Sequence, residues 1–191
     1  TGYLQYAMAL LAREYAPELA LLGVDLPGAD KIPCLRFDEA KRLAAERYGY
    51  RIRDPYDLEP EEEAHIGRYA KEELGSDLVF VTHYPSKKRP FYAMDDPDDP
   101  RYTLSFDLLF RGLEVTTGGQ RVHGYADQVA KMEARGMDPT DFEHYLMIHR
   151  HGMPPHGGLG IGLERLTMQL CGLDNIRYAS LFPRDRTRLE P

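Results

Sequence analysis

The stretch at residues 157–166, GGLGIGLERL, decides how we interpret the rest of the sequence. Glycine alternates with leucine or isoleucine from Gly158 to Leu163, and a period of two residues is typical of a β-strand. Glycine weakens the interior of a strand, so it usually marks a place where a ligand or another backbone comes very close. The stretch therefore predicts a strand with one bare face.

A helix is predicted directly after this strand. Residues 162–173, GLERLTMQLCGL, carry an apolar stripe and no proline. Arg165 falls in the first turn of this helix, where a fixed cation beside the bare strand is placed to meet a phosphate. The alternative is a buried glycine-rich strand that only packs against a helix, and the pattern alone does not decide between the two.

The segment at residues 157–173 resembles motif 3 of the class II aminoacyl-tRNA synthetases, in which a glycine–hydrophobic alternation precedes an acidic residue and an arginine. The flanking segments, HGMPPHGG before it and NIRYASLFPRDRTRLEP after it, are similar to those of the archaeal-type aspartyl-tRNA synthetases and their asparaginyl relatives. The resemblance implies that Gly158, Gly160 and Gly162 bind ATP. It also implies that Arg165 is a catalytic residue that holds the γ-phosphate.

The composition excludes several other classes of protein. The chain has 191 residues, 42% of them hydrophobic, which is enough to bury a core and is unlike a disordered chain. A net charge of −7 argues against a general nucleic-acid binder, although a local patch can still contact tRNA. Cys34 and Cys171 lie far apart, which suits a reducing compartment. No apolar run approaches the roughly 20 residues that a membrane helix needs, so we expect a cytoplasmic protein without a membrane partner.

The remaining pattern predicts strands flanked by helices. Helices are expected at residues 3–22, 39–48, 60–74, 125–135 and 140–149, and strands at residues 77–84, 102–110 and 114–123. The last two strands surround Arg111 and Gly112, so we expect them to form an antiparallel pair. The fold class is therefore α+β, and the resemblance implies a class II synthetase-type antiparallel sheet flanked by helices.

Three glutamates at residues 61–63 fall in the first turn of a predicted helix. The helix dipole favours negative charge at this end of a helix. We interpret these glutamates as a solvated face and not as a metal site.

Two further carboxylates, Asp107 and Glu114, lie on either side of the predicted strand turn. If both face the same side of the sheet, their oxygens suit a hard divalent cation such as Mg²⁺. Spacing alone favours a pair of surface acids. In the similar synthetases, however, acidic residues at these positions bind the magnesium that bridges the ATP phosphates, so the resemblance implies a metal and ATP site at Asp107 and Glu114.

The segment GGQR at residues 118–121 carries the candidate for substrate recognition. Two glycines allow a ligand to approach the backbone, and the planar fork of Arg121 can bind a carboxylate through two hydrogen bonds. An isolated arginine in a strand is more often solvated. The resemblance implies that Arg121 is a catalytic residue that holds the side-chain carboxylate of aspartate, and that Tyr92, in RPFY, belongs to the same substrate pocket.

The resemblance implies an aspartate–tRNA ligase that uses ATP and Mg²⁺, takes aspartate and tRNA as partners, and acts as a homodimer. Motif 1, motif 2 and an anticodon-binding domain are not recognisable. We therefore expect residues 1–191 to be the C-terminal part of a class II catalytic domain whose N-terminal part is missing. Three alternatives remain open. They are an ammonia-dependent asparagine synthetase-like enzyme, an asparaginyl-tRNA synthetase paralogue, and an inactive fragment that serves as an interaction module.

Overall fold

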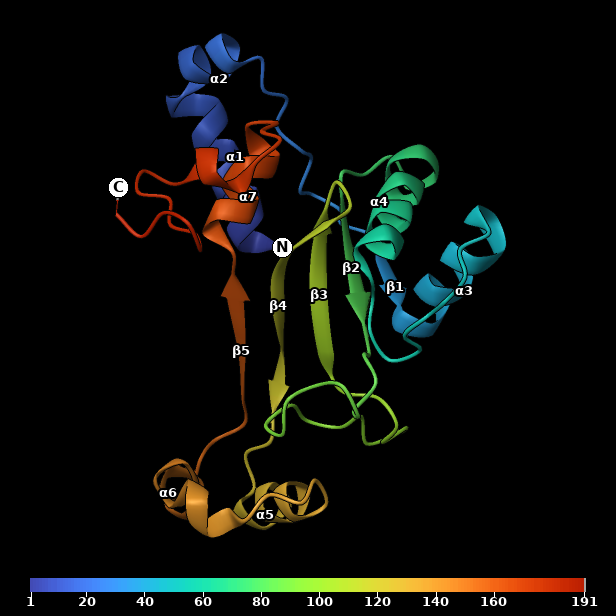
Figure 1. Cartoon of the computed structure of the whole chain (residues 1–191), viewed down its shortest axis with the longest axis vertical. Coiled ribbons are helices and arrows are strands. Elements are labelled where there is room, and N and C mark those ends of the chain that lie inside the picture. Colours follow the sequence, from blue (N-terminus) through green and yellow to red (C-terminus); the bar gives the residue numbers. More distant parts are fainter. Residues whose placement is uncertain (191) are drawn as a thin grey trace.

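A computed structural model describes residues 1–190 of the chain. A five-stranded sheet forms its centre, and the strands lie side by side in chain order (Figure 1). They are β1 (Cys34–Arg36), β2 (Leu78–Thr82), β3 (Ser105–Phe110), β4 (Leu113–Arg121) and β5 (His156–Ile161). The pairs β2–β3, β3–β4 and β4–β5 are antiparallel, whereas β1 runs parallel to β2 and is joined to it by a long crossover. The predicted α+β fold with an antiparallel sheet is confirmed, with one parallel pair at its edge.

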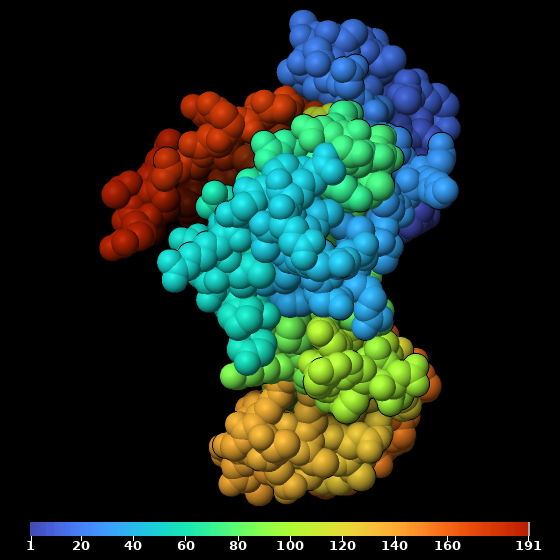
Figure 2. All heavy atoms as spheres, turned by 90° about the vertical axis from the view of Figure 1, so that its right-hand side faces the viewer, coloured from blue at the N-terminus to red at the C-terminus, as the bar shows by residue number. Residues whose placement is uncertain are grey.

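Helices cover the sheet and its two ends. They are α1 (Gly2–Glu14), α2 (Ala16–Leu22), α3 (Phe37–Tyr48), α4 (Pro60–Leu74), α5 (Tyr125–Glu133), α6 (Glu143–Arg150) and α7 (Leu163–Leu170), with short 3₁₀ turns η1 (Pro139–Phe142) and η2 (Ile176–Ala179). Figure 1 places α5 and α6 at one end of the sheet and α1, α2 and α7 at the other. Figure 2 shows the same two ends from the side. Within residues 1–190, the helices are too short or too polar to cross a membrane.

Two predicted helices differ in detail from the observed ones. The helix expected at residues 3–22, with a break or kink at Pro17, is divided two residues earlier, at Tyr15. Pro17 lacks an N–H and is tolerated in the first turn of a new helix, α2. The helix expected at residues 140–149 begins as the 3₁₀ turn η1, where the side chain of Asp138 accepts a hydrogen bond from the Thr140 N–H.

The core has two layers because the central strands are apolar on both faces. On one face, Val79, Val81 and Leu109 are buried with residues of α3 and α4. On the other face, Leu78, Leu108, Phe110 and Val115 are buried with Leu4 and Met8 of α1 and Leu166 of α7. Strand β5 lies at the edge of the sheet, and Leu159 is 60% exposed there. The alternative interpretation of β5 as a buried strand is therefore wrong for the described chain.

Helix α4 approaches the β3–β4 turn so closely that only glycine fits at the contact. A Cβ atom added to Gly67 would lie 2.3 Å from the backbone nitrogen of Gly112. Gly112 has a φ of 78° and Arg111 a φ of 49°, so the turn needs the left-handed backbone that glycine adopts most readily. The contact fixes the start of β4 against α4.

This packing corrects the interpretation of the glutamates at residues 61–63. Glu62 is fully buried, and its carboxylate lies 2.7 Å from Nζ of Lys41 on α3. The Glu63 carboxylate accepts a hydrogen bond from the backbone N–H of Glu114, at 2.9 Å. The solvated-face prediction is wrong for these two residues, because α3 and the hairpin cover the side of α4 that carries them.

Candidate active site

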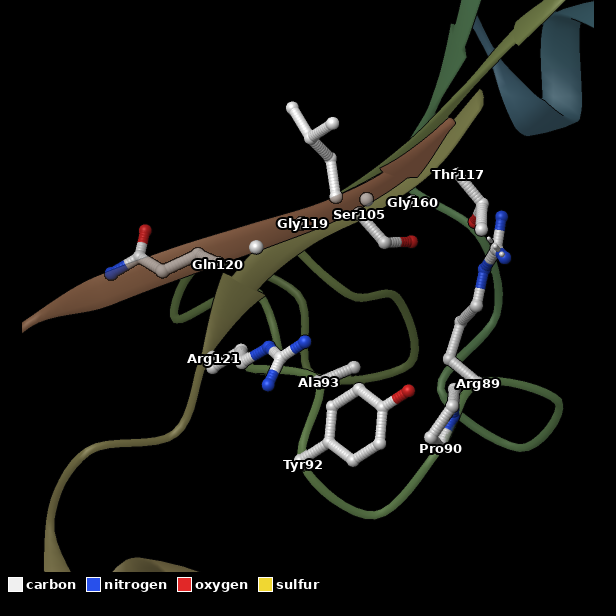
Figure 3. A pocket seen from close by; sticks show the side chains of 13 residues that line it. Arg89, Pro90, Tyr92, Ala93, Ser105, Thr117, Gly119, Gln120, Arg121 and Gly160 are labelled. Atoms are coloured by element: carbon white, nitrogen blue, oxygen red, sulfur yellow. Dashed lines mark hydrogen bonds between the residues drawn. The ribbon is translucent and has the colours of Figure 1, made fainter. Parts of the chain in front are cut away.

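A cavity of about 380 Å³ lies between strands β4 and β5 and the loop at residues 85–95, which we call the pocket loop (Figure 3). Four of the residues singled out from the sequence line it: Tyr92, Arg121, Gly158 and Gly160. Tyr92 comes from the pocket loop, Arg121 from the end of β4, and the glycines from β5. The fold therefore brings together three segments that are far apart in the chain.

Arg121 is held in place on two sides. A Cβ atom added to Gly158 would lie only 2.8–3.0 Å from the guanidinium of Arg121, so this guanidinium rests on the bare face of β5. On its other side, Cζ of Arg121 lies 4.8 Å from the centroid of the Tyr92 ring, within the range of a cation–π interaction. The bare strand face predicted from the sequence is confirmed. Arg121 occupies it at Gly158, whereas the space above Gly160 is open.

The structure adds Arg89, which the sequence analysis missed. Arg89 lines the cavity, and Figure 3 shows it and Arg121 on either side of Tyr92. Its Nη2 atom lies 2.6 Å from Oδ2 of Asp107, and its Nη1 donates a hydrogen bond to Oγ1 of Thr117 at 3.2 Å. Two arginines therefore line one small cavity. The guanidinium of Arg89 is already paired with Asp107 and lies over the ring of Tyr84, so Arg121 is the one that suits an anionic ligand. The sequence offered one indication of this role, because Arg89 lies three residues before Tyr92. It was missed because an arginine in a polar loop is usually solvated.

A β-bulge decides which way Glu114 points. In the β3–β4 ladder Asp107 is opposite Thr117, but Leu109 is opposite Glu114, with a register shift between Leu108 and Leu109. Residues directly opposite each other share a face of the sheet, and so do residues two apart on one strand. Because of the shift, Glu114 lies on the same face as Asp107; a regular ladder would have turned it to the other face.

Glu63, Asp107 and Glu114 form what we call the carboxylate cluster. Burial, and then the negative charge of Asp107, raise the pKa of Glu114. Burial raises the pKa of Glu63 to about 7; the hydrogen bond from the Glu114 N–H opposes this shift, and the charges of Glu114 and Asp107 add to it. The three carboxyl groups therefore repel one another in a site that is partly shielded from water. A cation bound there would be strongly stabilised, because little water screens its attraction to the carboxylates.

The cluster fits a magnesium ion that takes its remaining ligands from phosphate and water. Within residues 1–190, Oδ1 of Asp107 is buried without a hydrogen-bond partner, and no three ligand side chains converge into a complete metal site. Mg²⁺ prefers oxygen ligands and is usually held by one or two carboxylates together with substrate phosphates. Asp107 and Glu114 supply that kind of incomplete ligand set.

Arg165 lies beside the cluster and outside the cavity lining. Its Nη1 donates a hydrogen bond to the backbone carbonyl of Glu114 at 2.9 Å and lies 3.8 Å from Oε1 of the same residue. Its side chain remains 45% exposed. Gly162, the N-cap of α7, donates a backbone hydrogen bond to Val115 and so fixes the start of α7 against β4.

The predicted residues therefore form two neighbouring groups. Tyr92, Arg121, Gly158 and Gly160 line the cavity, and Asp107, Glu114, Gly162 and Arg165 lie at or near the carboxylate cluster. Arg89 joins the two groups, because its guanidinium pairs with Asp107 while its side chain lines the cavity. The arrangement places the guanidinium of Arg121 at the cavity, and the acidic side chains with Arg165 beside it.

Comparison with known proteins gives the class of this chain. The profile of the family "tRNA synthetases class II (D, K and N)" matches residues 6–186. The chain belongs to this family, as the glycine-rich strand and the helix that follows it predict.

Individual relatives show which enzymes of this family the chain is similar to. The chain is 52% identical over 175 residues to the aspartate–tRNA(Asp/Asn) ligase of Thermus thermophilus, a match that covers 91% of this chain and 40% of the relative. It is 44% identical over 192 residues to the enzyme of the same name from Aeropyrum pernix, covering 100% of this chain and 43% of the relative. The chain thus spans about two-fifths of the length of the curated relatives that it matches.

Solved structures give the same fold. The asparaginyl-tRNA synthetase of Pyrococcus horikoshii is 33% identical and superposes with a TM-score of 0.86 over 98% of this chain and 44% of that one. The aspartyl tRNA synthetase of Entamoeba histolytica is 38% identical, with a TM-score of 0.79 over 85% of this chain and 33% of that one. Because both specificities share this fold, the fold alone does not distinguish aspartate from asparagine.

Proposed function

We propose that this chain carries the amino-acid subsite and part of the ATP subsite of an aspartate–tRNA ligase. The observation that carries the proposal is the position of Arg121, fixed between Gly158 and Tyr92 in a cavity that a second guanidinium, from Arg89, also lines. Asp107 already compensates the charge of Arg89. The forked cation of Arg121 is therefore what favours a carboxylate side chain over a neutral amide, which would leave its charge uncompensated. The names of the relatives at 52% and 44% identity support aspartate.

The reaction has two steps. The α-carboxylate of aspartate attacks the α-phosphate of ATP and pyrophosphate leaves, which gives aspartyl-adenylate; a ribose hydroxyl of the tRNA then attacks the mixed anhydride, and AMP leaves. Arg121 binds the side-chain carboxylate, so that the α-carboxylate is held toward the phosphate. Arg165 neutralises phosphate charge from the first turn of α7. Such positioning and charge neutralisation, without covalent catalysis by the protein, account for most of the acceleration in reactions of this kind.

Asp107 and Glu114 would hold Mg²⁺, which when bound neutralises charge on the ATP phosphates. The unpartnered Oδ1 of Asp107 and the raised pKa of Glu114 support this assignment. Arg89 binds the other oxygen of Asp107 and so orients this carboxylate. The open space above Gly160 is suited to the flat adenine or ribose side of the nucleotide, which needs a floor without side chains.

The proposal extends to the partners and the compartment. We propose that the full gene product acts as a homodimer in the cytoplasm, with aspartate, ATP and tRNA as its ligands. The asparaginyl-tRNA synthetase alternative is favoured only by the shared fold, for which the TM-score of 0.86 is the observation. An amide-forming enzyme would keep the same residues and release free asparagine. An inactive module would keep them and form no product.

The test is ATP–pyrophosphate exchange by the full gene product, with aspartate and asparagine compared at the same concentration. Exchange that depends on aspartate, followed by formation of aspartyl-tRNA, is the expected result. Exchange with asparagine alone overturns the assignment of the substrate. Release of free asparagine when ammonia is added identifies the amide-forming alternative, and the absence of exchange with either amino acid leaves the interaction module as the explanation. Sedimentation of the same preparation tests the homodimer.

A further inference from the structure

The backbone of the pocket loop is hydrogen-bonded on two sides. Successive residues alternate between bonds to the β4 side and bonds to the α5 side. The carbonyl of Tyr92 accepts a hydrogen bond from the Val122 N–H at 2.9 Å, and the Met94 N–H donates to the carbonyl of Gln120 at the same distance. These bonds join the loop to β4 and its extension, next to Arg121. The carbonyls of the residues that alternate with them, Phe91 and Ala93, therefore point away from the sheet.

Helix α5 supplies the partners of those carbonyls. Nε2 of Gln128, which is fully buried, donates to the carbonyl of Phe91 at 3.1 Å. Nζ of Lys131 donates to the carbonyl of Ala93 at 2.5 Å. The side chain of Lys131 is only 10% exposed, so its cation is largely removed from water.

Arg135, in the turn after α5, holds the start of the same loop. Its Nη1 donates to the carbonyl of Arg89, and its Nη2 donates to the carbonyl of Ser86, both at 2.5 Å. Ser86 in turn donates to the carboxylate of Asp95, which also pairs with Lys131 at 2.6 Å. The two ends of the loop are therefore closed by one partly buried polar network.

The spacing of these three side chains explains how α5 and the turn after it hold the loop. Residues 128, 131 and 135 are three and four positions apart, and the backbone hydrogen bonds of Ala134 and Arg135 continue the helical turn beyond Glu133. Such residues lie on one face of a helix. All three have long side chains with donors at the tip, as a row of carbonyls requires.

We propose that Lys131 and Arg135, with Gln128, are positioning residues of the amino-acid subsite: through the backbone of the pocket loop they fix Arg89 and Tyr92 relative to Arg121. The inference rests on the proposed function and deepens it. The carbonyl that Arg135 holds belongs to Arg89 itself, and Tyr92 lies between the two carbonyls held by Gln128 and Lys131. None of the three donors lines the cavity, so they act only through the loop.

The test uses the full gene product with Arg135→Met, which keeps an unbranched stem about as long as the methylene part of arginine and removes both donors. A displacement of about 1 Å in a binding group costs up to roughly 100-fold in rate, so we expect KM for aspartate to rise about tenfold in ATP–pyrophosphate exchange. KM for ATP should rise much less, because Arg135 reaches the metal side only indirectly, through the pairing of Arg89 with Asp107. Arg135→Lys, which restores one donor and the charge, should recover part of the loss. Glu133→Gln, an exposed α5 residue that faces away from the loop network, is the matched control and should change neither constant.

Two further measurements separate positioning from a loss of folding. Hydrogen exchange of the peptide that covers residues 85–95 should be faster in the Arg135→Met variant, with exchange in α3 unchanged. In a double-mutant cycle with Tyr92→Leu, the effect of Arg135→Met on KM for aspartate should shrink, because the two residues act through one loop.

Several outcomes would overturn the inference. They are an aspartate KM equal to the wild-type value in Arg135→Met, an equal rise in KM for aspartate and for ATP, unchanged exchange in the pocket loop, and additive effects with Tyr92→Leu. A wild-type protein that does not activate aspartate overturns instead the proposed function, and the hydrogen-exchange result then shows separately whether α5 holds the loop.

Discussion

The cavity and the carboxylate cluster are neighbours, but they are prepared for their ligands to different degrees. In the cavity, Arg121 already lies against Gly158 and Tyr92, and the loop opposite it is hydrogen-bonded to α5 and to the turn after α5. In the cluster, Arg165 is 45% exposed and touches mainly a backbone carbonyl. The side chains of the cavity are therefore preorganised by contacts within this chain, whereas the cluster keeps repelling carboxylates and an exposed cation; under the proposed function these are the amino-acid side and the phosphate side of the site.

The largest effect is expected from Arg121→Leu, which removes the fork from the preorganised side. Charge-assisted hydrogen bonds contribute about 1.5–3 kcal/mol each, so the loss of two should lower kcat/KM for aspartate by roughly 1000-fold. Exchange kinetics at varied aspartate measure the loss. KM for ATP should change little, and a loss shared equally by both substrates would contradict the separation of the two subsites.

Arg165→Ala tests the phosphate side and should have the next largest effect. Removal of one group that stabilises developing phosphate charge costs roughly 100-fold in kcat. Single-turnover formation of aspartyl-adenylate gives this rate directly, and the melting temperature should not fall, because the side chain is half exposed. A rate close to that of the wild type would dismiss the assignment of Arg165.

Two glycine substitutions compare the two subsites within one strand. Gly158→Ala places a methyl group 2.8–3.0 Å from the guanidinium of Arg121, so this arginine must move. KM for aspartate should rise roughly tenfold, in line with the cost of a misplaced binding group. Gly160→Ala meets no atom within 4 Å and should instead raise KM for ATP, by filling the open floor. If both substitutions alter the same constant, the strand does not divide the two ligands.

The smallest effect at saturating metal is expected from Asp107→Asn and Glu114→Gln. Each removes one charged oxygen ligand, which weakens Mg²⁺ binding without removing a phosphate contact of the protein. Titration of exchange activity with Mg²⁺ should show midpoints shifted to higher concentration, about tenfold, with most of the activity restored at the plateau. Titration curves that overlay the wild type would show that the two carboxylates are structural.

The sequence by itself determined the local elements and the family. The alternation at Gly158 to Leu163 predicted strand β5, the apolar stripe after it predicted α7, and the two strands around Arg111 and Gly112 predicted the β3–β4 hairpin. These predictions were correct because each rests on periodicity within one short segment, where backbone geometry and side-chain direction are local. The family followed from the same short segment and the residues on either side of it.

The tertiary structure alone decided which residues meet. The register shift that turns Glu114 toward Asp107 depends on how two strands pair, and no local pattern announces it. The sequence predicted that Glu62 and Glu63 are solvated acids in the first turn of a helix, but α3 and the β3–β4 hairpin cover them in the fold. Arg89 and Arg135 are both arginines in polar segments of sequence, and only the packing of α5 under the pocket loop shows that one faces the cavity and the other holds it there. The physical reason is that burial and charge pairing arise between segments distant in the chain, where sequence spacing carries no information about distance.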